Sequence, residues 1–536
     1  MFGCGRYCVT TKSPLTGAYL CSLAGGFFAD KIKSSGYDAI VVEGRAEKPV
    51  YVWIEAGKVS IEDAARLWGL TTTKTQEKIR EEKGEKGEIA CIGPAGEQSL
   101  NYACVVNGVR VAGRGGAGAV MGSKNLKAIG LLGGDHTVEP KDRETFREIR
   151  QQMMKIMMDD PYSKTINKYG TQFGAEMGHK MGLLPIANFQ QKELVGVEGI
   201  SGDTFQRYKV ADYACSVCPL ACSNILEIKE GRYAGAKVRG PEYETLFSLG
   251  GNCQVTDAEA IIYANWLCDE YGVDTISTGV SIGFAMELYE QGLISKEDLG
   301  GIELAFGNGD AMVKMVEMIV ENKGFGKVLS QGVRKAAQTI GKGSETFAAH
   351  VKGLEFPGYD PRTIKGMGLA YATCAQGASH NRGSVLLAPP TSYLKEEDAP
   401  PFIKESQDLC AVVDSLISCS FTTFRYFQSK SASPEWYAKL LGALTGEESL
   451  SSPAGLLRIG ERIFNVERAF NVREGLDRKD DTLPRRFLEE GFRGGFAKGQ
   501  TVDLEKMLVP YYRLRGWDEN GIPTGEKLRE LGIEAV

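Results

Sequence analysis

Hydrophobic and polar positions follow two different patterns along the 536-residue chain. Up to about residue 140 the apolar positions form short runs rich in valine and isoleucine, and glycine turns separate these runs. The runs predict strands over residues 37–44, 48–55, 87–93 and 126–134, with a helical insert near Ala64–Lys83. We therefore expect the first part of the chain to be built around sheets.

Beyond residue 139 apolar residues recur at steps of three and four positions, which is the helical period. The clearest helical segments are residues 143–160, 257–272 and 276–292. A turn-rich segment, 350–368, predicts a boundary between two helical domains. We expect an α+β protein in which a β-sheet-rich domain (1–140) is followed by two mainly α-helical domains (141–349 and 350–536).

Charge and cysteine usage narrow the functional classes. The formal net charge is −6 and no basic stripe runs along the chain, so nucleic acid is not an expected partner. No charge-free apolar run reaches the ~18 residues of a membrane span, and the first residues lack the features of a secretory signal. The odd number of cysteines, 13, argues against a disulfide framework, so we expect a cytoplasmic protein.

Three cysteines at short spacing, Cys215, Cys218 and Cys222, form the strongest local motif. Thiolates at this spacing can converge on a zinc ion or an iron–sulfur cluster. No second pair lies nearby in the sequence, so a fourth ligand must come from a distant segment; Cys419 is the best candidate and Cys410 the next. The alternatives are that these cysteines are only small buried hydrophobic residues, or that they bind zinc.

A glycine-rich segment, residues 112–130, contains Arg114. Successive backbone amides in such a segment can bind an anion such as a phosphate. Its Gly113-x-Gly115-x-x-Gly118 spacing matches a dinucleotide-binding fingerprint, but no clear strand leads into it and no acidic residue follows at the right distance. Anion binding and a tight glycine turn between strands explain the segment equally well.

Two acidic motifs share one spacing. Asp269 and Asp274 are five positions apart, and so are Asp414 and Cys419. Carboxylates suit a ligand that is rich in N–H donors, and two such elements could hold it from opposite sides. Asp274 could equally cap the helix that follows it.

Two further residues are candidates for proton transfer. His380 lies in a glycine- and serine-rich loop, where a histidine can act as a general acid or base or can simply lie at the surface. Glu244, like Glu242, follows a Gly-Pro turn at the start of a predicted helix. A glutamate in the first helical turn can instead serve only to complement the helix dipole.

Taken together, these motifs resemble the aldehyde:ferredoxin oxidoreductase family. The resemblance extends over essentially the whole chain, and the matching segments run in the family's order. They are GRYCVTTKSPLTG, SSGYDAIVVEGRAEKPVYVWI, IGPAGE, GRGGAGAVMGSKNLKAI, CSVCPLAC, GPEYE, CDEYGVDTISTG, YDPRTIKGMGLAYAT, DSLISCSF and RKDDTLPRRFLEE. Several of these segments are long and specific.

The resemblance implies a tungsten (or molybdenum) bis-pterin enzyme in which magnesium links the pterin phosphates. A sheet-built pterin-binding domain would pack against two helical domains. Glu244 and His380 would lie near the metal as proton-transfer groups. A 4Fe–4S cluster would be bound by Cys215, Cys218, Cys222 and Cys419. The residues expected to bind the pterin cofactor are Arg6, Gly25, Arg114, Gly115, Gly116, Asp269, Asp274, Arg382, Asp414 and Ser418.

The activity that the resemblance implies is oxidation of a small aldehyde to a carboxylic acid, with electrons leaving through the cluster to ferredoxin or another low-potential carrier. Three alternatives stay open on the sequence alone. The chain could be the catalytic subunit of a related complex that reduces an aromatic thioester or another carbonyl substrate. It could also be a non-catalytic iron–sulfur electron carrier, or a structural protein stabilised by zinc.

Four departures from the family's pattern bear on these expectations. The chain starts about seventy residues inside the family's first domain, which would leave sheet edges unpaired. Leu23 replaces an asparagine that contacts pterin, and in the second acidic motif Ile417-Ser418 replaces a glycine followed by a leucine. Tyr263-x-x-Trp266 replaces a Glu-x-x-His motif that binds iron between subunits, so no bridging iron is expected. A homodimer on other contacts, or a place in a larger complex, stays open.

Overall fold

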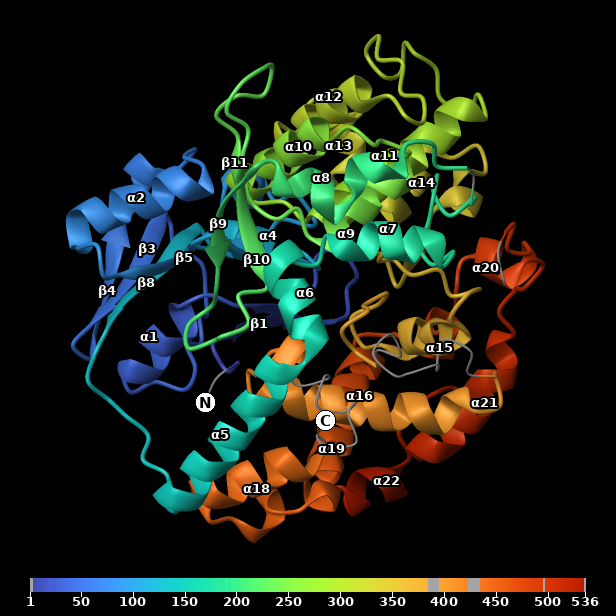
Figure 1. The fold of residues 1–536 in the computed structure, drawn as a ribbon. Helices are drawn as coiled ribbons and strands as arrows, with labels where there is room; N and C mark the ends of the chain where they lie inside the picture. Colours follow the sequence, from blue (N-terminus) through green and yellow to red (C-terminus); the bar gives the residue numbers. More distant parts are fainter. Residues whose placement is uncertain (1–2, 192, 384–394, 423–433, 495–496, 535–536) are drawn as a thin grey trace.

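The computed structural model describes residues 3–191, 193–383, 395–422, 434–494 and 497–534. Its largest sheet has six strands in the order β4-β3-β8-β5-β6-β7, with β3, β4, β5 and β8 at the left of Figure 1. β3 and β8 are parallel, and the other neighbours are antiparallel. The strands are β3 (Val50–Glu55), β4 (Lys58–Asp63), β5 (Glu88–Cys91), β6 (Val105–Asn107), β7 (Arg110–Ala112) and β8 (Leu126–Gly133).

Helices cover both faces of this sheet because side chains alternate along its strands. Tyr51 and Trp53 of β3 belong to a cluster on one face that includes Ile79 of α2 (Thr72–Lys83). Ile54 belongs to the cluster on the other face, with Phe28 of α1 (Phe28–Ser34). Figure 1 shows α2 and α1 on opposite sides of the strands.

Three smaller sheets, all antiparallel, also occur in the described residues. The first is the hairpin of β1 (Tyr7–Lys12) and β2 (Tyr19–Ala24). The second consists of β9 (Lys209–Tyr213), β10 (Ser223–Glu227) and β11 (Lys237–Arg239). The third pairs β12 (His350–Val351) with β13 (Leu354–Glu355).

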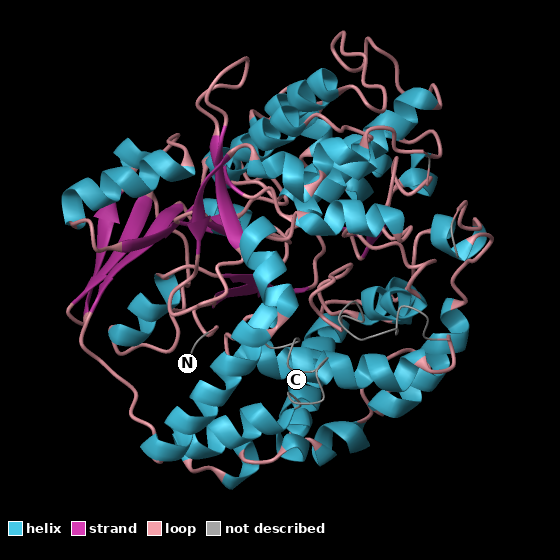
Figure 2. Ribbon diagram, viewed as in Figure 1, coloured by secondary structure: helices cyan, strands magenta, loops and turns pink. Residues whose placement is uncertain are grey.

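Helices make up most of the rest of the molecule, as Figure 2 shows. In the first half of the chain they are α3 (Pro94–Glu97), α4 (Ala117–Ser123), α5 (Arg143–Asp159), α6 (Pro161–Tyr169), α7 (Phe173–Lys180), α8 (Gly202–Gln206), α9 (Tyr243–Thr245) and α10 (Ala258–Tyr271). The helices that follow are α11 (Thr275–Glu290), α12 (Gly309–Val320), α13 (Gly326–Leu329), α14 (Val333–Ile340), α15 (Lys365–Thr373), α16 (Ala399–Ser415), α18 (Pro434–Thr445), α19 (Pro453–Arg473), α20 (Arg485–Glu489), α21 (Leu504–Arg515) and α22 (Gly525–Glu530). Helices α10–α14 lie at the top of Figure 1, and α16, α18, α19 and α22 lie at the bottom.

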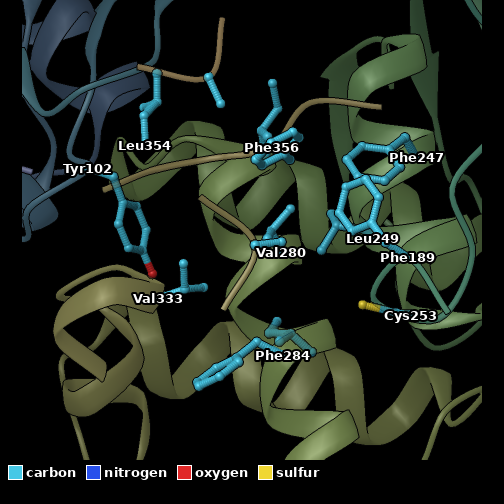
Figure 3. Packing of buried hydrophobic residues seen from close by; sticks show 14 of the residues in the cluster. Tyr102, Phe189, Phe247, Leu249, Cys253, Val280, Phe284, Val333, Leu354 and Phe356 are labelled. Carbon is cyan, nitrogen blue, oxygen red and sulfur yellow. The ribbon is translucent and has the colours of Figure 1, made fainter. Parts of the chain in front are cut away.

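One large hydrophobic core joins residues from all three predicted domains. Helix α11 is fully embedded in it, since every residue from 276 to 288 is buried. Phe189 packs against Phe247, with ring centroids 5.7 Å apart. Figure 3 shows part of this core around Val280 and Phe284 of α11. This burial explains why the sequence of α11 has apolar or small residues on every face of the helix.

The predicted strands at 48–55, 87–93 and 126–134 are confirmed as β3, β5 and β8. The prediction of a strand at 37–44 is wrong, because none of the described strands pairs with this segment. Its side chains do alternate: Ile40 and Val42 pack against the core, and Val41 is 81% exposed. The alternating pattern of segment 37–44 therefore indicates which of its side chains are buried. Its backbone has no described strand beside it to form the hydrogen bonds of a sheet.

The predicted helices at 143–160, 257–272 and 276–292 are confirmed as α5, α10 and α11. The insert predicted near Ala64–Lys83 starts with a short 3-10 helix, Ala65–Leu67, and its α-helix, α2, begins only at Thr72. Thr71 caps α2 by accepting a hydrogen bond from Lys74 N. The turn-rich segment at 350–368 is largely buried and holds the β12–β13 hairpin. The domain boundaries at residues 140 and 350 stay predictions. In the described part of the chain, no helix is both long enough and apolar enough to cross a membrane.

Candidate active site

The structure brings the four predicted cluster cysteines together. Cys215, Cys218 and Cys222 lie in the turn that joins β9 to β10, and Cys419 follows α16. The pKa of Cys218 is raised to about 12, mainly by burial, and the nearby Cys419, Cys222 and Cys215 act in the same direction. Within the described ranges, no three histidine, cysteine or acidic side chains are placed to hold a single metal ion. The four thiols are thus neighbours without being grouped around one ion.

Arg110, at the start of β7, lies beside these cysteines. Burial lowers the pKa of its guanidinium, but Cys222, Cys215 and Glu242 outweigh that effect, so the pKa ends above its ordinary value. Its Nε and Nη2 atoms are buried and have no hydrogen-bond partner. Gly25 separates the two groups: a Cβ there would lie 2.6 Å from Cys215 Sγ and 3.8 Å from Arg110 Nε. Glycine is therefore required at position 25 for this close approach.

Arg114 and Asp274 form a buried ion pair. Arg114 Nε lies 3.5 Å from Asp274 Oδ2, and the other guanidinium nitrogens donate to the backbone oxygens of Ala378 (2.6 Å) and Glu355 (2.5 Å). Asp274 also caps α11, because its carboxylate accepts hydrogen bonds from the N–H groups of Ile276 and Ser277 and from the Ser277 hydroxyl. The capping interpretation thus explains its contacts, and a pterin-binding role stays a prediction.

Asp269 lies near the C-terminal end of α10, where its carboxylate accepts a hydrogen bond from Asn265 Nδ2 at 3.1 Å. Burial raises the pKa of Asp269 to about 7, although Arg239 acts in the opposite direction. Near neutral pH this carboxyl group can therefore hold a proton or release it. Both Asp269 and Asp274 raise the pKa of the buried Cys104, so the two acids of the first motif both lie near this thiol.

Arg382 links two acids that are distant in sequence. Its Nε lies 3.0 Å from Asp414 Oδ2, and its Nη1 lies 3.1 Å from Glu467 Oε1. Burial raises the pKa of Asp414, and Arg382 and Arg6 lower it. Arg6, Arg382 and Asp414, which were predicted to bind the cofactor, therefore lie together.

Glu244 and His380 face each other, with Glu244 Oε1 3.6 Å from His380 Nδ1. Burial raises the pKa of Glu244 to about 7, although a hydrogen bond from Gly358 N to Glu244 Oε2 opposes it. The same burial, with Arg114 nearby, lowers the pKa of His380 to about 3. At neutral pH the histidine is uncharged, and the glutamate is close to half protonated.

The aromatic rings of Tyr243 and Tyr359 lie beside this pair. The rings of Tyr359 and His380 have centroids 5.9 Å apart, and those of Tyr359 and Tyr243 are 5.2 Å apart. Tyr243 donates its hydroxyl proton to the backbone oxygen of Gly358, which fixes the ring beside Glu244. The chain continues from α9 into a π-helical turn at Leu246–Gly250, a local form that is frequent at functional sites. Apolar walls of this kind account for the opposite pKa shifts of Glu244 and His380.

Two departures from the family's pattern have visible consequences after α16. Ile417 adopts φ +47°, in the left-handed region that disfavours β-branched residues, which explains why a glycine suits this position. Ser418 is buried, and its hydroxyl lies 2.8 Å from the Tyr437 hydroxyl. Leu23, on β2, is partly buried. A cofactor contact of Ser418 stays a prediction.

Within the glycine-rich segment, residues 113–116 form a turn between β7 and α4. A strand does lead into it, contrary to expectation: β7 ends at Ala112, and α4 and β8 follow. β7 runs antiparallel to β8, however, so no parallel βαβ unit forms and dinucleotide binding gains no support. Gly115 and Gly116 both have positive φ, and a Cβ at Gly116 would lie 2.0 Å from Asn101 O. Packing alone therefore requires these two glycines.

Unpaired polar atoms show what kind of group the site fits. Arg110 Nε, Arg114 Nε, Glu244 Oε1, His380 Nδ1 and Asp414 Oδ2 are all buried without a hydrogen bond of good geometry. An unsatisfied buried polar group costs about 1–3 kcal/mol. Both donors and acceptors are therefore available to a polar ligand, and the residues present fit a pterin-type cofactor beside a thiolate-bound cluster.

Sequence reasoning missed several members of the site: Arg110, Tyr243, Tyr359 and Glu467. Arg110 stands four positions before Arg114, and its own glycine neighbours give a weak signal. Glu467 lies 85 positions after Arg382, and nothing local in helix α19 distinguishes it from an ordinary helical glutamate.

Comparisons with known proteins agree with this arrangement. The family model described as aldehyde ferredoxin oxidoreductase, N-terminal domain, matches residues 1–133, and the model for domains 2 and 3 matches residues 148–533. The tungsten-containing aldehyde ferredoxin oxidoreductase of Pyrococcus furiosus is 42% identical over 542 residues, covering 99% of this chain and 87% of that protein. An aliphatic sulfonate oxidoreductase, WOR-like subunit, of the same organism is 32% identical, covering 98% and 85%.

A solved structure shares the fold. The active site complex BamBC of benzoyl coenzyme A reductase, in complex with 1,5-dienoyl-CoA, has a TM-score of 0.83 and is 23% identical, covering 99% of this chain and 86% of that chain. This likeness shows the fold alone and confirms the predicted α+β class. Because the two family models span nearly the whole sequence and a relative of 42% identity covers it, the chain belongs to the aldehyde ferredoxin oxidoreductase family.

Proposed function

We propose that this protein oxidises aldehydes to carboxylic acids and passes the electrons to ferredoxin. The names of its relatives at about 40% identity support this activity. The observation that carries the proposal is the Glu244–His380 pair, 3.6 Å apart inside aromatic walls, with an unpaired buried atom on each side chain. A protonation change near pH 7 is the property that a group moving protons during aldehyde oxidation needs.

The cofactors proposed for this site are a tungsten (or molybdenum) bis-pterin with bridging magnesium and a 4Fe–4S cluster. Cys215, Cys218, Cys222 and Cys419 would hold the cluster, since deprotonated thiolates are its usual ligands. The pterin would be held by the charged groups Arg6, Arg114, Asp269, Asp274, Arg382 and Asp414, all buried or partly buried, with Gly25, Gly115, Gly116 and Ser418 close to its edges. When bound, the pterin-held metal supplies two-electron chemistry and the cluster supplies one-electron transfer.

The residues of the chain have a defined task in this reaction. An aldehyde and water give a carboxylic acid, two protons and two electrons. The carboxylate form of Glu244 can accept a proton from water as it adds to the aldehyde carbonyl. Neutral His380 can donate or accept a hydrogen bond beside it without introducing a charge. The rings of Tyr243 and Tyr359 limit access of bulk water to the pair.

Aldehyde-dependent reduction of a viologen dye, measured anaerobically with the purified protein, tests this function. The expected result is one carboxylic acid released for every two viologens reduced, because viologen accepts single electrons. Reduction of an aromatic thioester without any aldehyde activity would overturn the proposal. The structural likeness to the benzoyl coenzyme A reductase complex concerns the fold alone, so it does not favour that second activity.

The remaining parts of the proposal concern surroundings and partners. Ferredoxin is the proposed electron acceptor, and a small aldehyde is the proposed substrate. A cytoplasmic location suits thiolate-bound clusters, which are sensitive to oxidation. A homodimer and a place in a larger complex are both compatible with the proposal. No bridging iron is proposed in either case, because Tyr263 and Trp266, whose ring centroids are 5.5 Å apart, stand where some members have a Glu-x-x-His motif. Sedimentation of the purified protein measures its oligomeric state.

A further inference from the structure

Tyr243 and Glu244 are consecutive in the chain, and both form a hydrogen bond with Gly358. The hydroxyl of Tyr243 donates to Gly358 O at 2.7 Å, and Gly358 N donates to Glu244 Oε2 at 2.9 Å. Tyr359 N donates to Pro357 O at 2.8 Å, which closes a γ-turn centred on Gly358. One small turn therefore connects the tyrosine hydroxyl with the carboxyl group of the next residue.

The turn packs so closely against its neighbours that position 358 requires glycine. A Cβ there would lie 2.8 Å from Phe247 Cγ and 3.0 Å from Tyr243 Cε1. Glycine has wide torsional freedom, so the backbone of Gly358 does not by itself fix the direction of its N–H group. The hydrogen bond from the Tyr243 hydroxyl, together with the γ-turn, supplies that restraint.

The two carboxyl oxygens of Glu244 have different surroundings. Oε2 accepts the hydrogen bond from Gly358 N. Oε1 is buried, has no hydrogen bond of good geometry, and lies 3.6 Å from His380 Nδ1. Because a carboxyl group is planar, the bond on Oε2 also fixes the direction in which the free Oε1 points.

The same hydrogen bond opposes the effect of burial on Glu244. Burial raises the pKa of this carboxyl group; the bond from Gly358 lowers it more than Arg114 does, and Asp274 raises it. His380 is uncharged near neutral pH, because burial lowers its pKa to about 3. The phenols that face Glu244 stay protonated, because burial raises their pKa values well above the ordinary one; they are Tyr243, Tyr359 and Tyr371. The bond from Gly358 is thus a main stabiliser of the carboxylate form.

We propose that Tyr243 is a positioning residue for Glu244: its hydroxyl holds the Gly358 turn, and the turn holds the carboxyl group with its free oxygen toward His380. This inference rests on the function proposed for Glu244. Without the hydroxyl, Gly358 O would lose its donor and the turn would be free to rotate. The carboxylate would then lose part of the hydrogen bond that favours its charged form.

Y243F tests the proposal, because it keeps the aromatic ring and removes only the hydroxyl. In the pH profile of kcat/KM for an aldehyde, we expect the acidic limb of Y243F to lie about one pH unit above that of the wild type, a tenfold change in the acid dissociation constant. G358A should move the limb in the same direction, because the added Cβ would push the turn away from Phe247.

Y102F is the matched control for Y243F. The hydroxyl of Tyr102 is also buried and also donates to a backbone oxygen, that of Leu329, at 3.2 Å. Y102F therefore loses the same kind of bond in another place, and its acidic limb should stay at the wild-type position. An equal displacement of the limb in Y102F and Y243F would overturn the proposal.

Infrared titration of the purified protein gives a second readout that does not depend on turnover. The carbonyl stretching band of protonated Glu244 is the band that E244Q lacks, and its midpoint should lie at higher pH in Y243F than in the wild type. Equal midpoints in these two proteins would overturn the proposal, whatever happens to turnover. A shifted midpoint combined with a pH profile that does not depend on Glu244 would support the positioning and contradict the proposed function.

Discussion

Glu244 and His380 respond to the same surroundings in opposite directions. Burial favours the uncharged form of each, so the pKa of the acid rises to about 7 and that of the base falls to about 3. A residue flanked by water would show neither shift. At pH 7 the uncharged histidine and the half-protonated glutamate together carry about half a negative charge, and this becomes a full negative charge as pH rises above the pKa of Glu244.

The first prediction concerns the pH dependence of turnover. If the carboxylate of Glu244 accepts the proton, kcat/KM for an aldehyde should fall as pH decreases below about 7, because the group is then protonated. E244Q should lower kcat by about 10²–10⁴-fold and remove that acidic limb. The measurement is a steady-state profile from acid to alkaline pH with viologen as acceptor.

E242Q is the matched control for this profile. Burial raises the pKa of Glu242, but Arg239 and Arg110 lower it more, so its net shift is downward. Its replacement should leave the position of the limb unchanged, whatever it does to stability. A wild-type profile that is flat through pH 7, or a limb that persists in E244Q, would rule out the role given to Glu244.

The second prediction concerns Arg110 and the proposed cluster. A positive charge beside the cluster favours its reduced, more negative form, so R110Q should lower the midpoint potential. A charge several ångströms away in a partly buried site contributes about 1–2 kcal/mol, which is on the order of 40–90 mV for one electron. R110K should keep part of the effect. Potentiometric titration followed by electron paramagnetic resonance measures it, and equal potentials in all three proteins would contradict it.

At the scale of elements, Asp257 and Asp274 occupy the same position, the N-cap, of two successive helices, but they differ in what else they contact. Asp257 caps α10 on the surface, where it accepts hydrogen bonds from Glu259 N (2.9 Å) and Ala260 N (3.2 Å). Asp274 caps α11 inside the protein and also neutralises Arg114. The two helices thus start in the same way, but only one start is part of the candidate site.

The third prediction follows from this difference. D257A should cost about 1 kcal/mol of stability, the usual contribution of a cap. D274A should cost about 3–5 kcal/mol, because it also leaves the buried Arg114 without its counter-charge. D274N keeps a capping oxygen but loses the charge, so its urea midpoint should lie close to that of D274A if the ion pair dominates. Urea midpoints measure all three, and equal midpoints for D257A and D274A would contradict the ion-pair contribution.

Elements were predictable from the sequence where one pattern decided the outcome. Helices α10 and α11 have apolar residues at helical spacing along their length and an aspartate at the N-cap, and both helices occur where the sequence predicts them. Segment 37–44 has the alternation of a strand but no neighbour to pair with, and a sequence pattern says nothing about backbone partners. The short strand β7 was not expected, because three residues are too few to show a period.

At the scale of the whole molecule, buried charges join segments that are far apart in the chain. Asp481 pairs with Lys352, at 2.8 Å, and with Arg468 of α19, at 2.8 Å, and accepts a hydrogen bond from Tyr512 of α21, at 2.6 Å. Each of these residues comes from a different element. Such a network holds those elements in one arrangement only while all of its members are charged or hydrogen-bonded.

The fourth prediction tests this network. D481N should destabilise the protein by about 3–5 kcal/mol, because two buried cations lose their counter-charge. Burial raises the pKa of Asp481, but Lys352 and Arg468 lower it more, so the net shift is downward. Its contribution is therefore present above its unfolded pKa and is lost as pH falls through the folded value, and the difference from wild type should shrink in acid.

D310N, at an exposed ion pair with Arg232, is the control and should change stability by less than about 1 kcal/mol. Thermal unfolding at neutral and acidic pH measures both variants. A D481N protein with the same melting temperature as the wild type at neutral pH would show that the network contributes nothing to stability.

The candidate site was predictable only in part, and long-range pairing sets the limit. Cys215 and its neighbours could be recognised because their spacing is local. The residue pattern offered Cys419 as the first of two candidates for the distant ligand, and the family resemblance selected it; the placement of Glu244 and His380 near the metal also came from the resemblance. The contact of Arg382 with Glu467 depends on how distant elements pack, and no residue pattern encodes it directly.

The metal and pterin content of the protein, purified without oxygen, tests the proposed function most directly. Mass spectrometry of the metals and a fluorescence assay for released pterin should give about four iron atoms and about one tungsten or molybdenum atom per chain, with pterin present. Such a result agrees with a complete aldehyde-oxidising site. Iron without tungsten, molybdenum or pterin would contradict the proposed function and would leave the chain as an iron–sulfur electron carrier.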